Sequence, residues 1–156
     1  MNLAELLKKE LIFITDSYDT TDAFYADYSA FLKNKGIIQD KENIKRLFVK
    51  RENLHPTAIG KGAATPHIFS EEFTDFFFSI ALIKNGLDFK APDGQLVYVV
   101  FLIMSDERQV SRHLKTLSRI ARMVNNTELI PQIKNTPNPN DIQTAVFENE
   151  QLIKCH

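Results

Sequence analysis

The chain has 156 residues, of which 44% are hydrophobic, with 19 basic and 20 acidic side chains and a formal net charge of −1. This length and composition predict one globular domain with a sizeable core. The balanced charge gives no electrostatic reason to bind nucleic acid or an anionic membrane surface, so any phosphate chemistry must be local.

The sequence carries the features of a cytoplasmic protein. Its only cysteine is Cys155, which excludes a disulfide within the chain. The longest apolar run, Leu96–Met104, has nine residues and is too short to cross a bilayer as a helix. The first ten residues lack the basic start and apolar stretch of a secretion signal. We therefore expect a cytoplasmic location without membrane insertion.

The N-terminal third predicts one strand and two helices. An apolar segment at 11–15 predicts a short strand, and apolar residues at helical spacing predict a helix from Thr20 or Thr21 to Asn34. Gly36 follows at the position where a helix end favours a left-handed residue. Asp40 can cap a second helix over 41–51.

The rest of the chain mixes strands with helices. Residues 57–67 are rich in glycine and alanine and predict a loop with a short strand leading to His67. The remaining expected elements are strands at 76–83 and 96–105 and helices at 106–125, 129–134 and 141–149. The second of these strands is apolar throughout, which is typical of a strand covered on both faces. We expect an α/β sandwich with helices on the faces of the sheet, formed by 1–150 and followed by a tail at 151–156.

His67 is the first candidate for chemistry. It closes the run Gly60-Lys61-Gly62-Ala63-Ala64-Thr65-Pro66-His67. Small residues let backbone amides approach an anion closely, and a proline restrains the chain before the imidazole. Neutral imidazole is nucleophilic near physiological pH and can accept a phosphoryl group. The alternative is a loop histidine satisfied by neighbouring polar groups.

His113 is the second candidate. It lies near the start of the predicted helix at 106–125, at the edge of its apolar stripe. A polar ring at that place needs a partner. It is either a core-edge histidine bonded to a backbone carbonyl or a ring beside a reaction centre.

Three residues can support such a site. Arg51, at the end of its predicted helix, can bind a phosphoryl group with two hydrogen bonds or simply complement the helix C-terminus. Glu52 can orient Arg51 or a histidine, or be a solvated charge. Thr57 can donate a hydroxyl hydrogen bond or serve as a turn residue. Metal ligation by His67 and His113 has no acidic or cysteine partner at ligand spacing, and no nucleotide-binding motif is present, so we expect neither metal nor cofactor.

Together these motifs resemble the enzyme IIA domains of the fructose–mannitol class, which belong to the bacterial phosphoenolpyruvate-dependent sugar phosphotransferase system. The resemblance also includes the nitrogen-regulatory enzyme IIA branch and extends from about Leu3 to Phe147. The matching residues are Arg51-Glu52, Thr57, Gly60-x-Gly62-Ala63-Ala64-x-Pro66-His67 and His113-Leu114-x-x-Leu117-x-x-Ile120-Ala121.

The resemblance implies a mixed sheet between helical layers. It also implies that His67 accepts a phosphoryl group from an HPr-type carrier and passes it to an enzyme IIB-type partner. His113 corresponds to the second active-site histidine and Arg51 to the nearby arginine. Thr65 before the proline and Ile68-Phe69 after His67 depart from the usual pattern and can alter the docking surface.

Three functions remain open at this point. The first is a phosphocarrier for sugar uptake and phosphorylation. The second is a regulatory module whose phosphorylation at His67 controls binding to other proteins. The third is an interaction domain that transfers no phosphoryl group.

Overall fold

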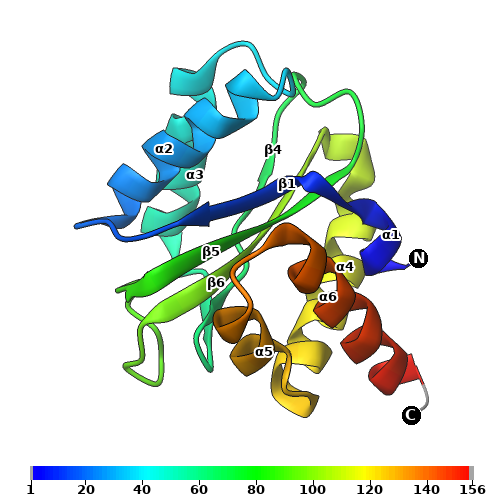
Figure 1. Cartoon of the computed structure of the whole chain (residues 1–156). Helices are drawn as coiled ribbons and strands as arrows, with labels where there is room; N and C mark the ends of the chain where they lie inside the picture. Colours follow the sequence, from blue (N-terminus) through cyan, green and yellow to red (C-terminus); the bar gives the residue numbers. More distant parts are fainter. Residues whose placement is uncertain (1, 155–156) are drawn as a thin grey trace.

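The computed structural model of the chain describes residues 2–154, and Cys155 and His156 lie outside them. In chain order the elements are α1 (Leu3–Leu6), β1 (Leu7–Thr15), α2 (Thr21–Asn34), α3 (Lys41–Leu54), β2 (Ala58–Gly60), β3 (Ala63–Ala64), β4 (His67–Phe69), β5 (Phe77–Leu87), β6 (Val97–Ser105), the 3₁₀ turn η1 (Glu107–Gln109), α4 (Val110–Asn126), α5 (Leu129–Asn135) and α6 (Pro139–Lys154). Figure 1 shows them as one α/β unit.

The strands of residues 2–154 form a mixed six-stranded sheet in the order β1-β5-β6-β3-β2, with β4 also paired to β6. The β1/β5, β3/β6 and β4/β6 pairs are parallel, whereas β5/β6 and β2/β3 are antiparallel. β6 is therefore the central strand, and β4 extends the line of β3 along it. The mixed α/β sandwich expected from the sequence is confirmed.

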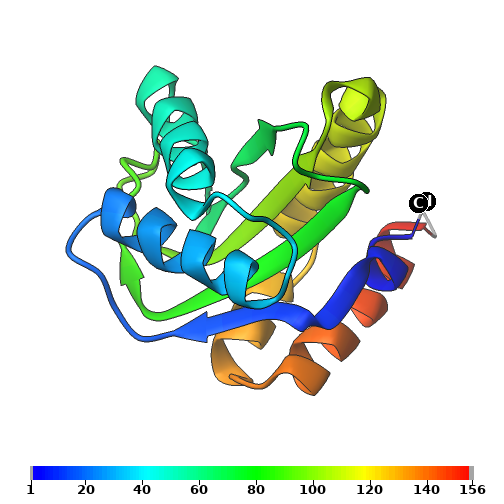
Figure 2. The same ribbon diagram turned by 90° about the horizontal axis from the view of Figure 1, so that it is seen from above.

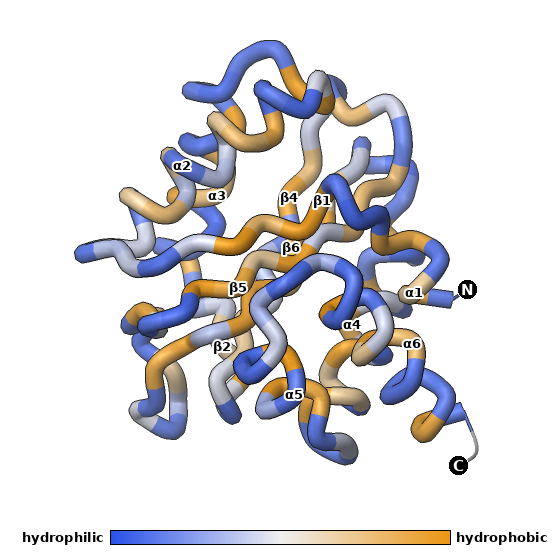
Figure 3. Tube along the Cα trace, viewed as in Figure 1, coloured by the Kyte–Doolittle hydropathy of each residue, from blue (hydrophilic) through white to orange (hydrophobic). Residues whose placement is uncertain are grey.

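The two faces of the sheet pack against different helices, and β6 shows this division. Its side chains at 99, 101 and 103 belong to the core formed with α1, α4, α5 and α6. Those at 100, 102 and 104 belong to the core formed with α2 and α3. Because successive strand side chains point to opposite faces, an unbroken apolar strand fits this position. The apolar residues accordingly gather along the middle of the sheet in Figure 3.

The helix boundaries follow the capping residues. The side chain of Thr20 accepts a hydrogen bond from the Ala23 amide at the start of α2, and Asp40 does the same for Asn43 in α3. Gly36 has φ +75° just after α2, a conformation that side-chain-bearing residues rarely adopt. These three positions agree with the sequence analysis.

Several predicted boundaries were wrong. β1 begins at Leu7, because its charged residues 8–10 lie exposed at the edge of the sheet, where strands commonly carry charge. The strand predicted at 76–83 continues to Leu87. The helix predicted from Asp106 starts instead as η1, capped by the Asp106 carboxylate, before α4 begins. Residues 151–154, assigned to a tail, continue α6, and Ile153 is buried.

The segment before and after His67 contains three short strands rather than one. β2, β3 and β4 have three, two and three residues, which is too short for a periodic pattern in the sequence. Viewed from above, the short arrow of β4 lies between α3 and α4 (Figure 2). None of the helices within residues 2–154 is long and apolar enough to span a membrane.

Candidate functional site

His67 is the first residue of β4, at the end of the Gly- and Ala-rich segment. It pairs with Ile103 of β6, whose amide donates a 3.2 Å hydrogen bond to the Pro66 carbonyl. The side chain is half-buried. Its Nδ1 is buried and makes no hydrogen bond of good geometry with the described residues, which leaves Nε2 as the nitrogen that a docking partner can reach.

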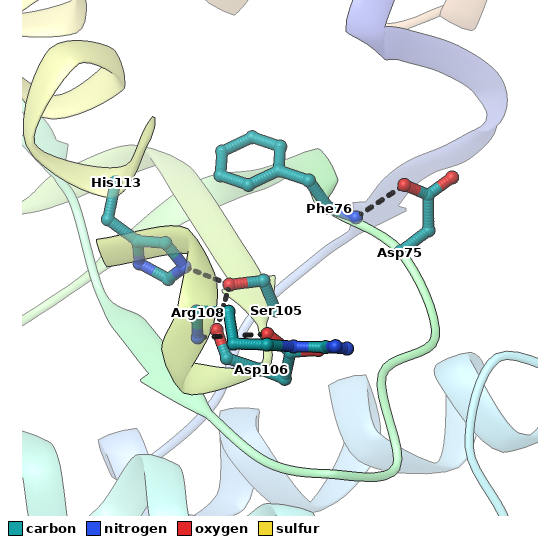
Figure 4. Close-up of polar contacts among 6 residues, drawn as sticks. All are labelled: Asp75, Phe76, Ser105, Asp106, Arg108 and His113. Atoms are coloured by element: carbon teal, nitrogen blue, oxygen red, sulfur yellow. Dashed lines mark hydrogen bonds and ion pairs between the residues drawn. The ribbon is translucent and has the colours of Figure 1, made fainter. Parts of the chain in front are cut away.

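His113 lies in the first turn of α4 and is only 1% exposed. Its ring stacks on Phe69 at 4.2 Å between centroids and meets Phe76 edge-on at 5.5 Å. Its Nε2 lies 2.6 Å from the hydroxyl oxygen of Ser105, the last residue of β6 (Figure 4). The partner that the sequence analysis required for this ring is thus a serine side chain, and not a backbone carbonyl.

The fold brings the two imidazoles together. Their ring centroids are 5.7 Å apart and their planes are inclined by 67°. Burial lowers the pKa of His67, the positive charge of Arg51 lowers it further, and the Thr65 backbone acts in the opposite direction. Burial, followed by the neighbouring His67, lowers the pKa of His113 to about 4. Both rings are therefore uncharged at neutral pH, as a nucleophilic imidazole must be.

Arg51 shares a shallow depression with His67. The guanidinium Nη1 donates a 2.9 Å hydrogen bond to the His55 carbonyl, which holds the side chain at the end of α3. The depression has a volume of about 410 Å³, and it is lined by Arg51, His55, Pro56, Thr57, Ala58, Ile59, Thr65, His67, Leu117, Ser118 and Ala121. A cation and a neutral imidazole on one open surface can receive a phosphoryl group from outside.

Glu52 and Thr57 are hydrogen-bonded to each other and not to the two imidazoles. The buried Glu52 carboxylate accepts hydrogen bonds from the Tyr25 hydroxyl at 2.6 Å, the Thr57 amide at 2.7 Å and the Thr57 hydroxyl at 2.8 Å. Glu52 is therefore neither a solvated charge nor a hydrogen-bond partner of Arg51 or a histidine, contrary to the alternatives drawn from the sequence. The Thr57 hydroxyl donates its proton to this carboxylate, so the same proton is not offered to a phosphoryl group in the depression.

Sequence reasoning missed the contacts of Ser105, Phe69 and Phe76 with His113, and also the hydrogen bond from Tyr25 to Glu52. Phe69 is the last residue of β4 and Ser105 is the last residue of β6, and both strand ends lie beside α4. No local sequence pattern predicts that these two residues come together.

A second, larger depression of about 560 Å³ lies near Lys61, Tyr98 and Lys134 and contains neither histidine. Within residues 2–154, no group of three or more histidine, cysteine or acidic side chains could hold a metal ion.

A family model for "Phosphoenolpyruvate-dependent sugar phosphotransferase system, EIIA 2" matches residues 5–149. The chain belongs to this family. It is 27% identical over 133 residues to the fructose-specific EIIABC component of Bacillus subtilis, covering 85% of this chain and 21% of that protein. It is 32% identical over 96 residues to a nitrogen regulatory protein of Bradyrhizobium diazoefficiens, covering 62% and 63%. The chain thus spans about a fifth and just under two thirds of these relatives.

Solved structures of enzyme IIA proteins share the fold. The nitrogen regulatory protein IIA-Ntr of Neisseria meningitidis superposes with a TM-score of 0.82 at 19% identity, covering 92% of this chain and 98% of that one. In a complex of mannitol enzyme IIA with phosphorylated enzyme IIB from Escherichia coli, the matching chain gives a TM-score of 0.73 at 16% identity, covering 90% and 97%. The family match confirms the resemblance stated from the sequence.

Proposed function

We propose that this EIIA protein is a phosphocarrier in which His67 accepts a phosphoryl group from an HPr-type phosphohistidine and passes it to an enzyme IIB-type partner. The observation that carries the proposal is the accessible Nε2 of a neutral imidazole beside Arg51 and a second neutral imidazole. In the transfer, the Nε2 lone pair of His67 attacks phosphorus and the phosphorus–nitrogen bond of the donor breaks. The electron pair of that bond returns to the donor imidazole.

The surroundings of His67 supply what such a transfer needs. Phosphoryl transfer depends mainly on positioning and on stabilising the charge spread over the phosphoryl oxygens. The Arg51 guanidinium is held at the rim of the depression and can approach those oxygens. In the step from the HPr-type carrier to His67, one phosphorus–nitrogen bond is exchanged for another, and we expect this step to use no metal or cofactor.

Exposed apolar side chains favour protein partners for this site. Leu54, at the end of α3, is 75% exposed, and Val110 and Leu114 of α4 are 50% and 64% exposed. α3 and α4 are also the helices that contribute Arg51 and Leu117 to the depression. A similar solved structure pairs mannitol enzyme IIA with phosphorylated enzyme IIB, which supports an enzyme IIB-type acceptor here. We place this exchange in the cytoplasm.

A regulatory module is the second candidate function. In that role, phosphorylation of His67 would control contacts with other proteins instead of feeding sugar uptake. The similarity to nitrogen regulatory proteins in both sequence and fold favours it. The two roles share the phosphorylation of His67 and differ in the downstream protein, so an assay with an enzyme IIB-type acceptor separates them.

The test of phosphorylation uses phosphoenolpyruvate, enzyme I and an HPr-type carrier with the purified chain. We expect the mass to rise by one phosphoryl group, in a bond that is acid-labile and alkali-stable. His67→Ala should abolish this increase with the fold retained, because the half-buried side chain contributes little to either core.

His55→Ala is the matched control for this experiment. His55 lines the same depression, its side chain is exposed, and its backbone carbonyl still accepts the hydrogen bond from Arg51 after substitution. This variant should be phosphorylated like the unaltered chain. Full phosphorylation of His67→Ala, or an alkali-labile label, would assign the phosphoryl group to another residue.

A further inference from the structure

The hydroxyl group of Ser105 makes two hydrogen bonds at the end of β6. Its oxygen lies 2.8 Å from the Asp106 carbonyl oxygen and 2.6 Å from Nε2 of His113 (Figure 4). The Asp106 carbonyl has no hydrogen and can only accept, so the single Ser105 proton is donated to it. The Ser105 oxygen is consequently an acceptor in its contact with His113.

This assignment fixes the proton of His113. A neutral imidazole carries one N–H donor and one bare acceptor nitrogen. Since Nε2 donates to Ser105, Nδ1 is the bare nitrogen, and it is buried with no hydrogen-bond partner among residues 2–154. The ring of His67 lies beside that of His113, with 5.7 Å between the centroids, and, after burial, it is the titratable group that lowers the pKa of His113. Neutral His113 therefore acts as a base at Nδ1 and has no second N–H with which to hold a phosphoryl oxygen.

The transfer proposed above creates a need for such a base. When Nε2 of His67 attacks phosphorus, the proton of that ring is on Nδ1, and the phosphorylated ring is positively charged until this proton leaves. The Thr65 backbone contact can stabilise the proton but cannot remove it. Within residues 2–154, no carboxylate is hydrogen-bonded to either histidine, and His113 is stacked on Phe69 and meets Phe76 edge-on.

We propose that Ser105 is a positioning residue of the phosphoryl site, which keeps Nδ1 of His113 bare so that it takes up the proton released by phosphorylated His67. The inference rests on the proposed function. The negative charge of the phosphoryl group raises the proton affinity of the neighbouring His113 ring, which is low before phosphorylation. His113 then carries a proton on both nitrogens, and its positive charge offsets part of the phosphoryl charge. Ser105 needs no rearrangement, because it accepts from Nε2 in both states. When the phosphoryl group leaves for its acceptor, the proton returns to His67.

The first experiment reads the tautomer of His113 in the protein without any phosphoryl donor. Nitrogen-15 NMR of histidine-labelled protein distinguishes a protonated ring nitrogen from a bare one. We expect His113 to be protonated on Nε2 alone at neutral pH, and Ser105→Ala to give a mixture of both tautomers. A His113 ring protonated on Nδ1 in the unaltered protein would overturn the inference.

The matched control is Ser79→Ala. Ser79 of β5 is also fully buried, and its hydroxyl donates a 2.6 Å hydrogen bond to the Leu11 carbonyl of the neighbouring strand β1. Both substitutions remove one buried serine hydroxyl from the sheet. The control should leave the His113 tautomer unchanged, so a loss of packing alone is separated from a loss of the Ser105 acceptor.

The second experiment measures the rate of phosphoryl transfer from the phosphorylated HPr-type carrier. We expect Ser105→Ala to slow transfer roughly 10-fold to 100-fold, by analogy with the loss of a hydrogen-bond partner that orients a metal-binding histidine. Ser79→Ala should stay near the unaltered rate. Equal rates in the two variants would remove Ser105 from the transfer while leaving the phosphocarrier function standing. If the unaltered protein accepted no phosphoryl group, the phosphocarrier function would fail, and the role of Ser105 in transfer with it.

Discussion

At the scale of single residues, the two histidines differ in how completely they are buried. His67 keeps one nitrogen accessible from the depression, whereas His113 is enclosed by aromatic rings with one nitrogen on Ser105. Burial disfavours the charged imidazole in both cases, and the adjacent Arg51 adds to this effect for His67. Both imidazoles are thereby kept uncharged near neutral pH, and no carboxylate among residues 2–154 is hydrogen-bonded to either ring.

The burial of His113 predicts a dependence of stability on pH. Its pKa is about 4 in the folded protein and about 6.5 in an unfolded chain, so the unfolded state binds the proton more readily between these values. The stability that neutral His113 contributes to the folded state is complete above about pH 6.5. The free energy of unfolding falls by about 3 kcal/mol as the pH falls toward 4. Urea unfolding at a series of pH values measures it.

His113→Gln provides the comparison for that series. Glutamine cannot take up a proton in this range, while the carboxyl groups that also titrate in acid are unchanged. We expect the free energy of unfolding of His113→Gln to fall less steeply between pH 6.5 and 4 than that of the unaltered protein. Parallel curves for the two proteins would show that His113 keeps an ordinary pKa.

At the scale of elements, Glu52 links two helices to the segment that leads to His67. It belongs to α3, accepts the Tyr25 hydroxyl from α2, and holds the Thr57 amide and hydroxyl just before β2. When a buried hydrogen-bond donor loses its acceptor, the free energy of its desolvation is no longer offset by a hydrogen bond. The position of the segment before His67 is therefore fixed by a carboxylate that does not touch either imidazole.

We predict that Glu52→Ala lowers the free energy of unfolding by about 3 kcal/mol, because three donors lose their acceptor. Tyr25→Phe removes only one of these hydrogen bonds and should cost about 1 kcal/mol. Urea unfolding of both variants and of the double variant forms a thermodynamic cycle. Additive effects in the double variant would contradict a direct link between the two side chains.

The sequence predicted elements well where a periodic pattern or a cap was present. The strand ending at Ser105 and the helices capped by Thr20 and Asp40 have such signals, and they were found. β2, β3 and β4 have none, since two or three residues show no period. The role of Glu52 was also beyond local patterns, because its partner Tyr25 lies 27 positions earlier in the chain.

At the scale of the whole molecule, Glu150 joins the N-terminal turn to the last helix. Its carboxylate, fully buried in α6, accepts hydrogen bonds from the amides of Leu3 at 2.7 Å and Ala4 at 3.2 Å. Arg119 of α4 approaches the same carboxylate at 3.3 Å. A negative charge at the start of a helix is favourable, and the arginine compensates its burial. Elements nearly 150 residues apart are thus connected by one side chain.

We predict that Glu150→Ala lowers the free energy of unfolding by about 2 to 3 kcal/mol, because two backbone donors and a partly buried guanidinium lose their acceptor. Glu148→Ala is the control, since Glu148 lies exposed on the same helix and its removal should change stability by less than about 0.5 kcal/mol. Thermal or urea unfolding compares them. Similar effects of both substitutions would mean that the buried carboxylate contributes no more than helix propensity.

The register between β4 and β6 determines which helical layer the imidazole meets. Ile68 faces the core of α2 and α3, so His67, its neighbour in the strand, faces the opposite way, toward α4. The number of residues between the turn that joins β2 to β3 and Pro66 sets this orientation, and the hydrogen bond from the Ile103 amide to the Pro66 carbonyl fixes it. Adding or deleting one amino acid in that interval would exchange the two side chains, hiding the imidazole among aliphatic groups and turning an isoleucine toward the partner. The number of residues in this interval therefore decides whether the imidazole faces α4 or the core of α2 and α3.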